Sequence, residues 1–158
     1  MWTEIDDVAA EAEMGEFLYG FVQMLKPDLV VETGTYKGHS SFLIFEALLA
    51  NESGKLISCD IEEYPRIFQT SDKCVEFRIC SSLDLPELKE ADFVFSDSDQ
   101  NLRQKEYKLV KPGCVFVVHD TARSYTTNTN QQWLGDWVRA EGGLTFNAGR
   151  GFGILIKK

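Results

Sequence analysis

The chain has 158 residues and a formal net charge of −9 at neutral pH, with 44% hydrophobic and 26% charged residues. This length and composition suit one globular domain, residues 1–158, with enough apolar side chains to bury a core. The acidic balance disfavours a nucleic-acid partner, because proteins that bind DNA or RNA usually carry a basic face. No apolar run approaches the roughly 20 residues that span a bilayer, so no membrane contact is expected. The acidic, polar N-terminus indicates neither a signal peptide nor a transit peptide.

In chain order, apolar periodicity first predicts a helix over residues 4–25, within an N-terminal helical segment of residues 1–27. Beyond it, apolar runs that predict strands alternate with stretches that predict helices. The strands are expected at 29–32, 55–60, 74–80, 91–97 and 114–120. Helices are expected between them at 40–50 and 101–110, with short helical segments near Ile67 and at 85–90.

Several of these five strands are apolar on both faces, as expected when helices cover both sides of a parallel sheet. A polar stretch without periodicity follows at 121–132, and a short helix is expected at 133–140. The last two apolar runs, 142–148 and 152–158, are joined by a glycine-rich link too short for a helix, so they should be antiparallel neighbours. The pattern predicts an α/β fold, Rossmann-like and doubly wound, with a mostly parallel seven-stranded sheet that ends in a C-terminal antiparallel hairpin.

The cysteines and the lysines both favour simple explanations. The four cysteines form no C-x-x-C pair, which is typical of reduced thiols in a cytoplasmic protein and lacks the tight clustering of a zinc site. Lys105, Lys108 and Lys111 are interleaved with Glu106 and apolar residues. We interpret this stretch as one solvated helix face.

The stretch VVETGTYKGHSS, residues 30–41, contains the first candidate site. Glu32 ends the first predicted strand, Gly34 and Gly38 permit a tight turn close to a ligand, and Ser40 could cap the following helix. The spacing is neither the dinucleotide G-x-G-x-x-G nor a P-loop, which ends in Gly-Lys-Ser/Thr. An acid is also out of place in a phosphate cradle, so this turn predicts a different ligand.

A carboxylate at Glu32 suits a ligand with an ammonium or sulfonium charge, and the helix start beyond Gly38 suits that ligand's carboxylate. Asp60 ends the second predicted strand, 28 residues beyond Glu32, where an acid can accept hydrogen bonds from ribose hydroxyls. A ribose joined to a zwitterionic amino acid describes S-adenosylmethionine. The alternatives are a generic strand–helix turn, a solvated acid at Glu32 and a helix cap at Asp60.

Together these motifs resemble those of the class I S-adenosylmethionine-dependent methyltransferases. The residues Gly34, Tyr36, Gly38 and Ser40 follow the G-x-Y-x-G-x-S pattern of the small O-methyltransferases related to catechol O-methyltransferase. The later stretches FVFSDSDQ and PGCVFVVHD are similar to motifs of that group and of related small bacterial methyltransferases. The resemblance spans about residues 28 to 120. It implies S-adenosylmethionine as cofactor, a small-molecule acceptor methylated at oxygen, and adenine contacts from Ser81 and Ser82.

Asp97 and Asp120 each follow a predicted strand, and their carboxylates could share a divalent cation if those strands are neighbours. In the catechol-type relatives, acids at these two positions and an Asn after the second hold magnesium. Thr121 stands in place of that Asn, and a hydroxyl is a weaker ligand. We therefore predict Asp97 and Asp120 as the residues that would hold magnesium, with His119 or Asp99 completing an altered shell.

The candidates for the general base are His119 and Asp99. The same relatives use a Lys three residues after the first acid, but Gln100 occupies that position and takes no proton. His119 has an ordinary pKa suited to a base, although strand alternation could instead turn it into the core. Asp97 is assigned to the cofactor site and to catalysis. Methyl transfer itself depends chiefly on alignment of the acceptor with the sulfonium.

Two other functions stay open from the sequence. The chain could be a nucleoside-binding module without methyl transfer, since the Lys and Asn of the relatives are replaced and little sequence remains to form a lid. It could also methylate a protein, although the N-P-P-Y signature of amino-group methylation is absent. A site with so little cover could be completed by a second copy, so a homo-oligomer is also predicted.

Overall fold

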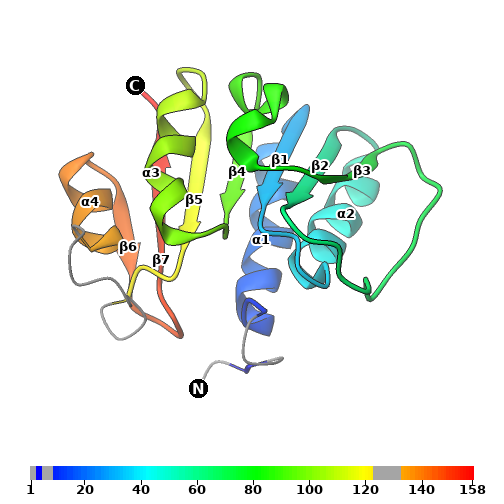
Figure 1. Ribbon diagram of the computed structural model, residues 1–158, viewed down its shortest axis with the longest axis horizontal. Coiled ribbons are helices and arrows are strands. Elements are labelled where there is room, and N and C mark those ends of the chain that lie inside the picture. The colour runs from blue at the N-terminus through cyan, green and yellow to red at the C-terminus, as the bar shows by residue number, and fades with distance from the viewer. Residues whose placement is uncertain (1–2, 5–8, 123–132) are drawn as a thin grey trace.

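The protein is built around one seven-stranded sheet in the order β3-β2-β1-β4-β5-β7-β6. The computed structural model describes residues 3–4, 9–122 and 133–158 (Figure 1). The strands are β1 (Leu29–Thr33), β2 (Lys55–Asp60), β3 (Val75–Ile79), β4 (Phe93–Ser96), β5 (Val115–His119), β6 (Leu144–Phe146) and β7 (Phe152–Ile156). The first five are parallel and β7 runs antiparallel to both β5 and β6, which confirms the predicted fold class.

Helices cover both faces of the sheet. On one face lie α1 (Ala12–Leu25) and α2 (His39–Asn51), whose side chains Leu18, Val22 and Leu48 pack in one core with Phe93 of β4. The helices α3 (Gln100–Leu109) and α4 (Leu134–Ala140) cover the other face (Figure 1), where the core includes Tyr107, Trp137 and Phe116. Two short 3-10 helices, η1 (Ser82–Asp84) and η2 (Pro86–Lys89), join β3 to β4. None of the helices in the described part of the chain has the length and apolarity needed to cross a membrane.

The structure departs from the sequence prediction in two segments. Among the described residues, the first helix begins at Ala12 rather than at residue 4, and the Glu11 carboxylate at its N-cap makes no capping bond but contacts His119 and the Arg150 backbone. The stretch around Ile67 contains no helix, because a short apolar pattern is compatible with several backbone conformations. The short helix predicted at 85–90 is present as the 3-10 helix η2.

The sheet order reverses between β1 and β4, which places their carboxyl ends side by side. Glu32 lies opposite Phe95, and Thr33 opposite Ser96, in the register of the two strands. The chain leaves β1 through Gly34, whose φ of 91° and N–H bond to the Cys59 carbonyl turn it across the end of β2. Ligands bind at such a reversal in open α/β sheets.

A glycine exchange at this turn provides a stability test. A Cβ at residue 34 would collide with the backbone carbonyl of Asp97, whereas a Cβ at Gly113, which has a similar φ of 87°, would have no neighbour within 4 Å. Both alanine variants carry the cost of left-handed backbone, about 1 kcal/mol. Overpacking adds about 1–3 kcal/mol at residue 34 alone.

We therefore expect Gly34→Ala to lower the free energy of unfolding by at least about 1 kcal/mol more than Gly113→Ala. Urea denaturation followed by circular dichroism measures both values. Equal losses in the two variants would contradict the close contact between this turn and β4.

Candidate functional site

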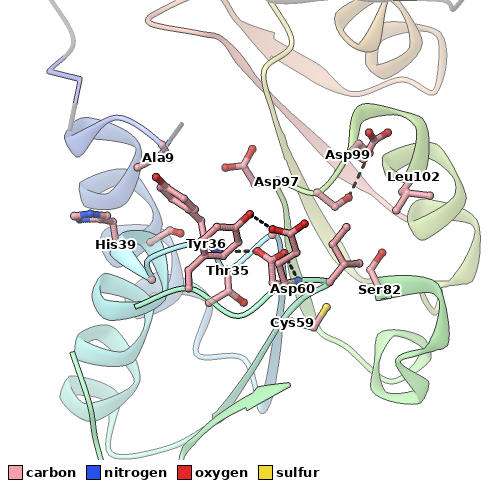
Figure 2. Close-up of a pocket in the computed structure, with 18 of the residues that line it drawn as sticks. Ala9, Thr35, Tyr36, His39, Cys59, Asp60, Ser82, Asp97, Asp99 and Leu102 are labelled. Carbon is pink, nitrogen blue, oxygen red and sulfur yellow. Dashed lines mark hydrogen bonds between the residues drawn. The ribbon is translucent and has the colours of Figure 1, made fainter. Parts of the chain in front are cut away.

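A pocket of about 350 Å³ opens at the carboxyl ends of the parallel strands (Figure 2). Its walls come from the glycine turn after β1, the ends of β2 and β3, the loop after β4, and the N-terminal residues Ala9 and Ala10. Figure 2 shows Ser82, Asp99 and Leu102 gathered on one side of Asp60, and Ala9 and His39 on the other. Asp97 lies between these two ends. The pocket therefore has two arms, one lined by Ser82, Asp99 and Leu102 and the other by Ala9 and His39, which meet at Asp60 and Asp97.

Four predicted cofactor residues of the glycine turn, Gly34, Tyr36, Gly38 and Ser40, line this pocket together with Asp60. Asp60 accepts a hydrogen bond from the Tyr36 backbone N–H at 2.8 Å, which fixes the turn against the end of β2. The alternative role of Asp60 as a helix cap is wrong, because no helix follows it before β3.

Glu32 lies beneath the turn rather than on the pocket wall. It is fully buried, and its carboxylate accepts hydrogen bonds from Ser40 at 2.5 Å, from Ser58 at 2.6 Å and from Ser41. Burial raises the pKa of Glu32 to about 7, against the opposing effect of these three donors. The reading of Glu32 as a solvated acid is therefore wrong. Ser40 donates to Glu32 and does not cap α2, whose N-cap is Gly38 without a side-chain bond.

A second buried carboxylate, Glu106 of α3, was missed from the sequence. Its side chain is fully buried and accepts hydrogen bonds from four hydroxyls, those of Thr33, Ser82, Ser96 and Ser98. The interpretation of its helix as one solvated face holds for the exposed Lys105 and Lys108 but is wrong for Glu106. The one available signal was the number of serines at the strand ends, since burial of a charge requires several hydrogen-bond partners.

The acids after β4 and β5 meet around the imidazole of His119. Its Nδ1 lies 3.1 Å from Asp97 and 3.5 Å from Asp120, and its Nε2 lies 2.8 Å from Glu11. Burial alone would lower the pKa of His119, but the three surrounding carboxylates outweigh it and raise the pKa to about 9. His119 is fully buried and does not line the pocket, whereas Asp97 and Asp120 do.

Two arginines complete this cluster. One nitrogen of Arg103, on α3, lies 3.2 Å from Asp97 and 3.1 Å from Asp120. Arg150 lies 2.7 Å from the other oxygen of Asp120 and also donates to the Ala9 carbonyl. Burial opposes ionisation of Asp120, yet the charges of His119 and of both arginines lower its pKa.

The remaining predicted residues fall in different places. Ser82 and Asp99 line the pocket, and Asp99 also caps α3 by accepting from the Asn101 N–H at 2.8 Å. Ser81 does not line the pocket; its hydroxyl accepts from the Leu83 N–H at the start of η1. The polar loop predicted at 121–132 lies outside the described residues apart from its first two positions.

Solved structures with the same fold include three methyltransferases. The O-methyltransferase TomG from Streptomyces achromogenes, in complex with SAM (S-adenosylmethionine), has a TM-score of 0.72 and 19% identity, and the match covers 96% of this chain and 83% of TomG. An O-methyltransferase from Bacillus cereus in complex with SAH (S-adenosylhomocysteine) has a TM-score of 0.69 and 20% identity, and the match covers 98% of this chain and 84% of that protein. The SAH-bound methyltransferase PaMTH1 from Podospora anserina has a TM-score of 0.68 and 16% identity, and the match covers 96% of this chain and 81% of PaMTH1.

At these identities the likeness establishes the fold, and a search of curated proteins found no match. The family is identified from the sequence itself. A family model described as a methyltransferase domain matches residues 31–121, a segment that begins in β1 and ends just after β5. This segment is more than half of the chain and carries the glycine turn, Asp60, Asp97 and Asp120. The chain therefore belongs to this methyltransferase domain family.

Proposed function

We propose that the protein transfers a methyl group from S-adenosylmethionine to a hydroxyl oxygen of a small molecule. The observation that carries the proposal is the pocket at the sheet reversal, where the glycine turn, Ser40 and Asp60 line one continuous wall. TomG and the Bacillus cereus protein, both described as O-methyltransferases in complex with SAM or SAH, support the cofactor and the oxygen acceptor.

Each part of the cofactor has a suitable partner in this pocket. The Oδ1 of Asp60, which accepts only a long hydrogen bond of 3.3 Å from the Glu62 N–H, suits the ribose hydroxyls, since Oδ2 accepts from the turn. The start of α2 after Gly38 suits the amino-acid carboxylate. Ser40 donates its hydroxyl proton to Glu32, so the lone pairs of its oxygen remain available to accept a hydrogen bond from the ammonium group. Glu32 would thus act on the ammonium through Ser40 rather than by direct contact.

Asp97 is our candidate for the group that receives the acceptor's proton. In the transfer, the bond from the acceptor oxygen to the methyl carbon forms as the sulfur–methyl bond breaks, and the hydroxyl proton leaves the oxygen. The Asp97 carboxylate lines the pocket between its two arms, while His119 holds that carboxylate from behind at 3.1 Å. We therefore assign His119 a positioning role. Asp99, on the pocket rim, stays the alternative base.

The predicted magnesium site at Asp97 and Asp120 does not fit the residues around it. The donor atoms of Asp97, His119 and Asp120 all lie within 4.8 Å of one another, which suits an ion in spacing. However, Arg103 already bridges both carboxylates and Arg150 pairs with Asp120, so two fixed positive charges balance the two acids. A divalent cation there would face uncompensated repulsion. Thr121, in place of the relatives' Asn, does not line the pocket. We derive no metal-dependent step.

The wider predictions remain part of this proposal. We propose one domain over residues 1–158 and a cytoplasmic location, which the four free thiols support. A homo-oligomer also stays a prediction, supported by the exposed Leu144, Phe146 and Ile156 on β6 and β7. The non-catalytic binding module and the protein methyltransferase are the competing outcomes of an acceptor screen.

That screen tests methyl transfer directly. The protein is incubated with methyl-labelled S-adenosylmethionine and a panel of phenols, catechols and aliphatic alcohols, beside a set of unstructured peptides. We expect a labelled methyl ether from at least one small hydroxyl compound. Label in peptides alone, or tight cofactor binding without any product, would contradict the proposal.

The cofactor site is tested by calorimetry with S-adenosylhomocysteine. We expect Asp60→Asn to weaken binding about 10- to 100-fold, because a charged acceptor for the ribose hydroxyls becomes a neutral one. Asp84→Asn, which removes the same charge from an exposed acid outside the pocket, is the matched control and should leave the dissociation constant unchanged. Equal changes of the dissociation constant in the two variants would show that Asp60 does not bind the cofactor.

The raised pKa of Glu32 predicts that binding of S-adenosylhomocysteine depends on pH. Its pKa of about 7 in the free protein means that it is largely protonated below that pH. A cofactor ammonium against Ser40 favours the ionised form, so affinity should rise between pH 6 and pH 8, by at most about tenfold per pH unit for one proton. Glu32→Gln should lose this slope, and measuring both proteins in the same buffers cancels the titration of the ligand itself. A slope that survives in the variant contradicts the assignment.

A separate measurement tests whether the protein binds a divalent metal ion. Electron paramagnetic resonance of Mn²⁺ and calorimetry with Mg²⁺ should detect no site at millimolar concentrations in the intact protein, because the arginines already neutralise the acids. Chelation should leave any methyl transfer found in the screen unchanged. A stoichiometric Mn²⁺ signal that Asp120→Asn abolishes would show that a metal displaces the arginines.

A further inference from the structure

The buried Glu106 holds four hydroxyl groups against the floor of the pocket. Its Oε1 accepts from Ser82 at 2.5 Å and from Ser98 at 2.6 Å, and its Oε2 accepts from Ser96 at 2.5 Å and from Thr33 at 3.1 Å. A carboxylate accepts hydrogen bonds and donates none, so each of these hydroxyls points its proton at Glu106. The direction of four hydrogen bonds is therefore set by one side chain.

Two of the four hydroxyls belong to the pocket wall. Ser82 and Ser98 line the pocket, whereas Thr33 and Ser96 do not. A serine hydroxyl has one proton and two lone pairs, so a serine whose proton goes to Glu106 can only accept a hydrogen bond from a ligand. Ser98 also lies 3.5 Å from the Asp99 carbonyl, but the much shorter bond to Glu106 takes the proton. This part of the wall thus presents two acceptors and no hydroxyl donor.

The position of the pair identifies the group that it would meet, on the basis of the proposed cofactor. With the ribose at Asp60 and the amino-acid end at the glycine turn, the purine must extend into the opposite arm. Figure 2 shows Ser82, Asp99 and Leu102 together in that arm. Adenine carries one exocyclic donor, its 6-amino group. Hypoxanthine carries an oxo group at the same carbon, which would face the lone pairs of the two serines.

We propose that Glu106 is a positioning residue that turns Ser82 and Ser98 into a pair of acceptors and thereby selects a 6-aminopurine over a 6-oxopurine. Without a carboxylate behind them, both hydroxyls could rotate to donate, and the wall would accommodate either base. Selection thus comes from a side chain that does not itself touch the ligand. This inference rests on the proposed function and adds a specificity determinant to it.

The test compares S-adenosylhomocysteine with S-inosylhomocysteine by calorimetry on the full chain. The two ligands differ at C6, which carries an amino or an oxo group, and at the adjacent N1, which is an acceptor in adenine and carries a proton in hypoxanthine. We expect the intact protein to bind the adenosyl compound at least about tenfold more tightly, since the oxo compound loses a hydrogen bond and buries an acceptor against acceptors. Glu106→Gln presents an amide donor to the serines and should bring the affinity ratio close to one. Ser96→Ala, which removes a Glu106 partner outside the pocket, should keep the ratio of the intact protein.

The affinity ratio distinguishes a positioning role of Glu106 from a purely structural role, because loss of structure would weaken the binding of both ligands equally. An affinity ratio near one in the intact protein, or an unchanged ratio in Glu106→Gln, overturns the inference. If the intact protein still binds S-adenosylhomocysteine, the proposed function is not affected by that result. Failure of the intact protein to bind S-adenosylhomocysteine contradicts the proposed function itself. If Glu106→Gln does not fold, Ser82→Ala and Ser98→Ala replace it. Each should lower the ratio, and an unchanged ratio in both overturns the inference.

Discussion

Two buried carboxylates support the end of the sheet where the pocket opens. Glu32 is held by three serine hydroxyls and Glu106 by four hydroxyls, and together they tie β1, β2 and β4 to the two helices that begin nearest the pocket. Such acids are costly to bury unless every lone pair is used. The cost explains the many serines at these strand ends, and three of these hydroxyl groups, those of Ser40, Ser82 and Ser98, belong to residues that also line the pocket.

The acids on the opposite wall are satisfied in a different way. Asp97 and Asp120 are matched by the guanidinium groups of Arg103 and Arg150, with His119 and Glu11 pairing behind them. Arginine suits this position because its planar fork reaches several oxygens and never loses its proton. The burial of these acids is thus offset by ion pairs rather than by serine hydroxyls.

The sequence predicted the sheet well because buried parallel strands are marked by continuous apolar runs and their ends converge by topology. Asp60 and Asp97 could be placed at the carboxyl ends of the strands for this reason, and both line the pocket. Glu106 and Arg103 could not, because a charged residue in a polar helix normally faces solvent, and only the packing of α3 over the strand ends turns these two inward. Ser40 was read as a cap for a similar reason, since its true partner, Glu32, lies under the turn.

The contacts of Glu11 also determine when the pocket can exist during synthesis of the chain. This one carboxylate joins His119, 108 residues further on, and the backbone of Arg150, 139 residues further on. Both segments must therefore have left the ribosome before these contacts close, since contacts between distant segments form only after both are available. A nascent chain that stops before β7 has the glycine turn but lacks Arg150, so the wall of the pocket that Arg150 lines forms later than the glycine turn.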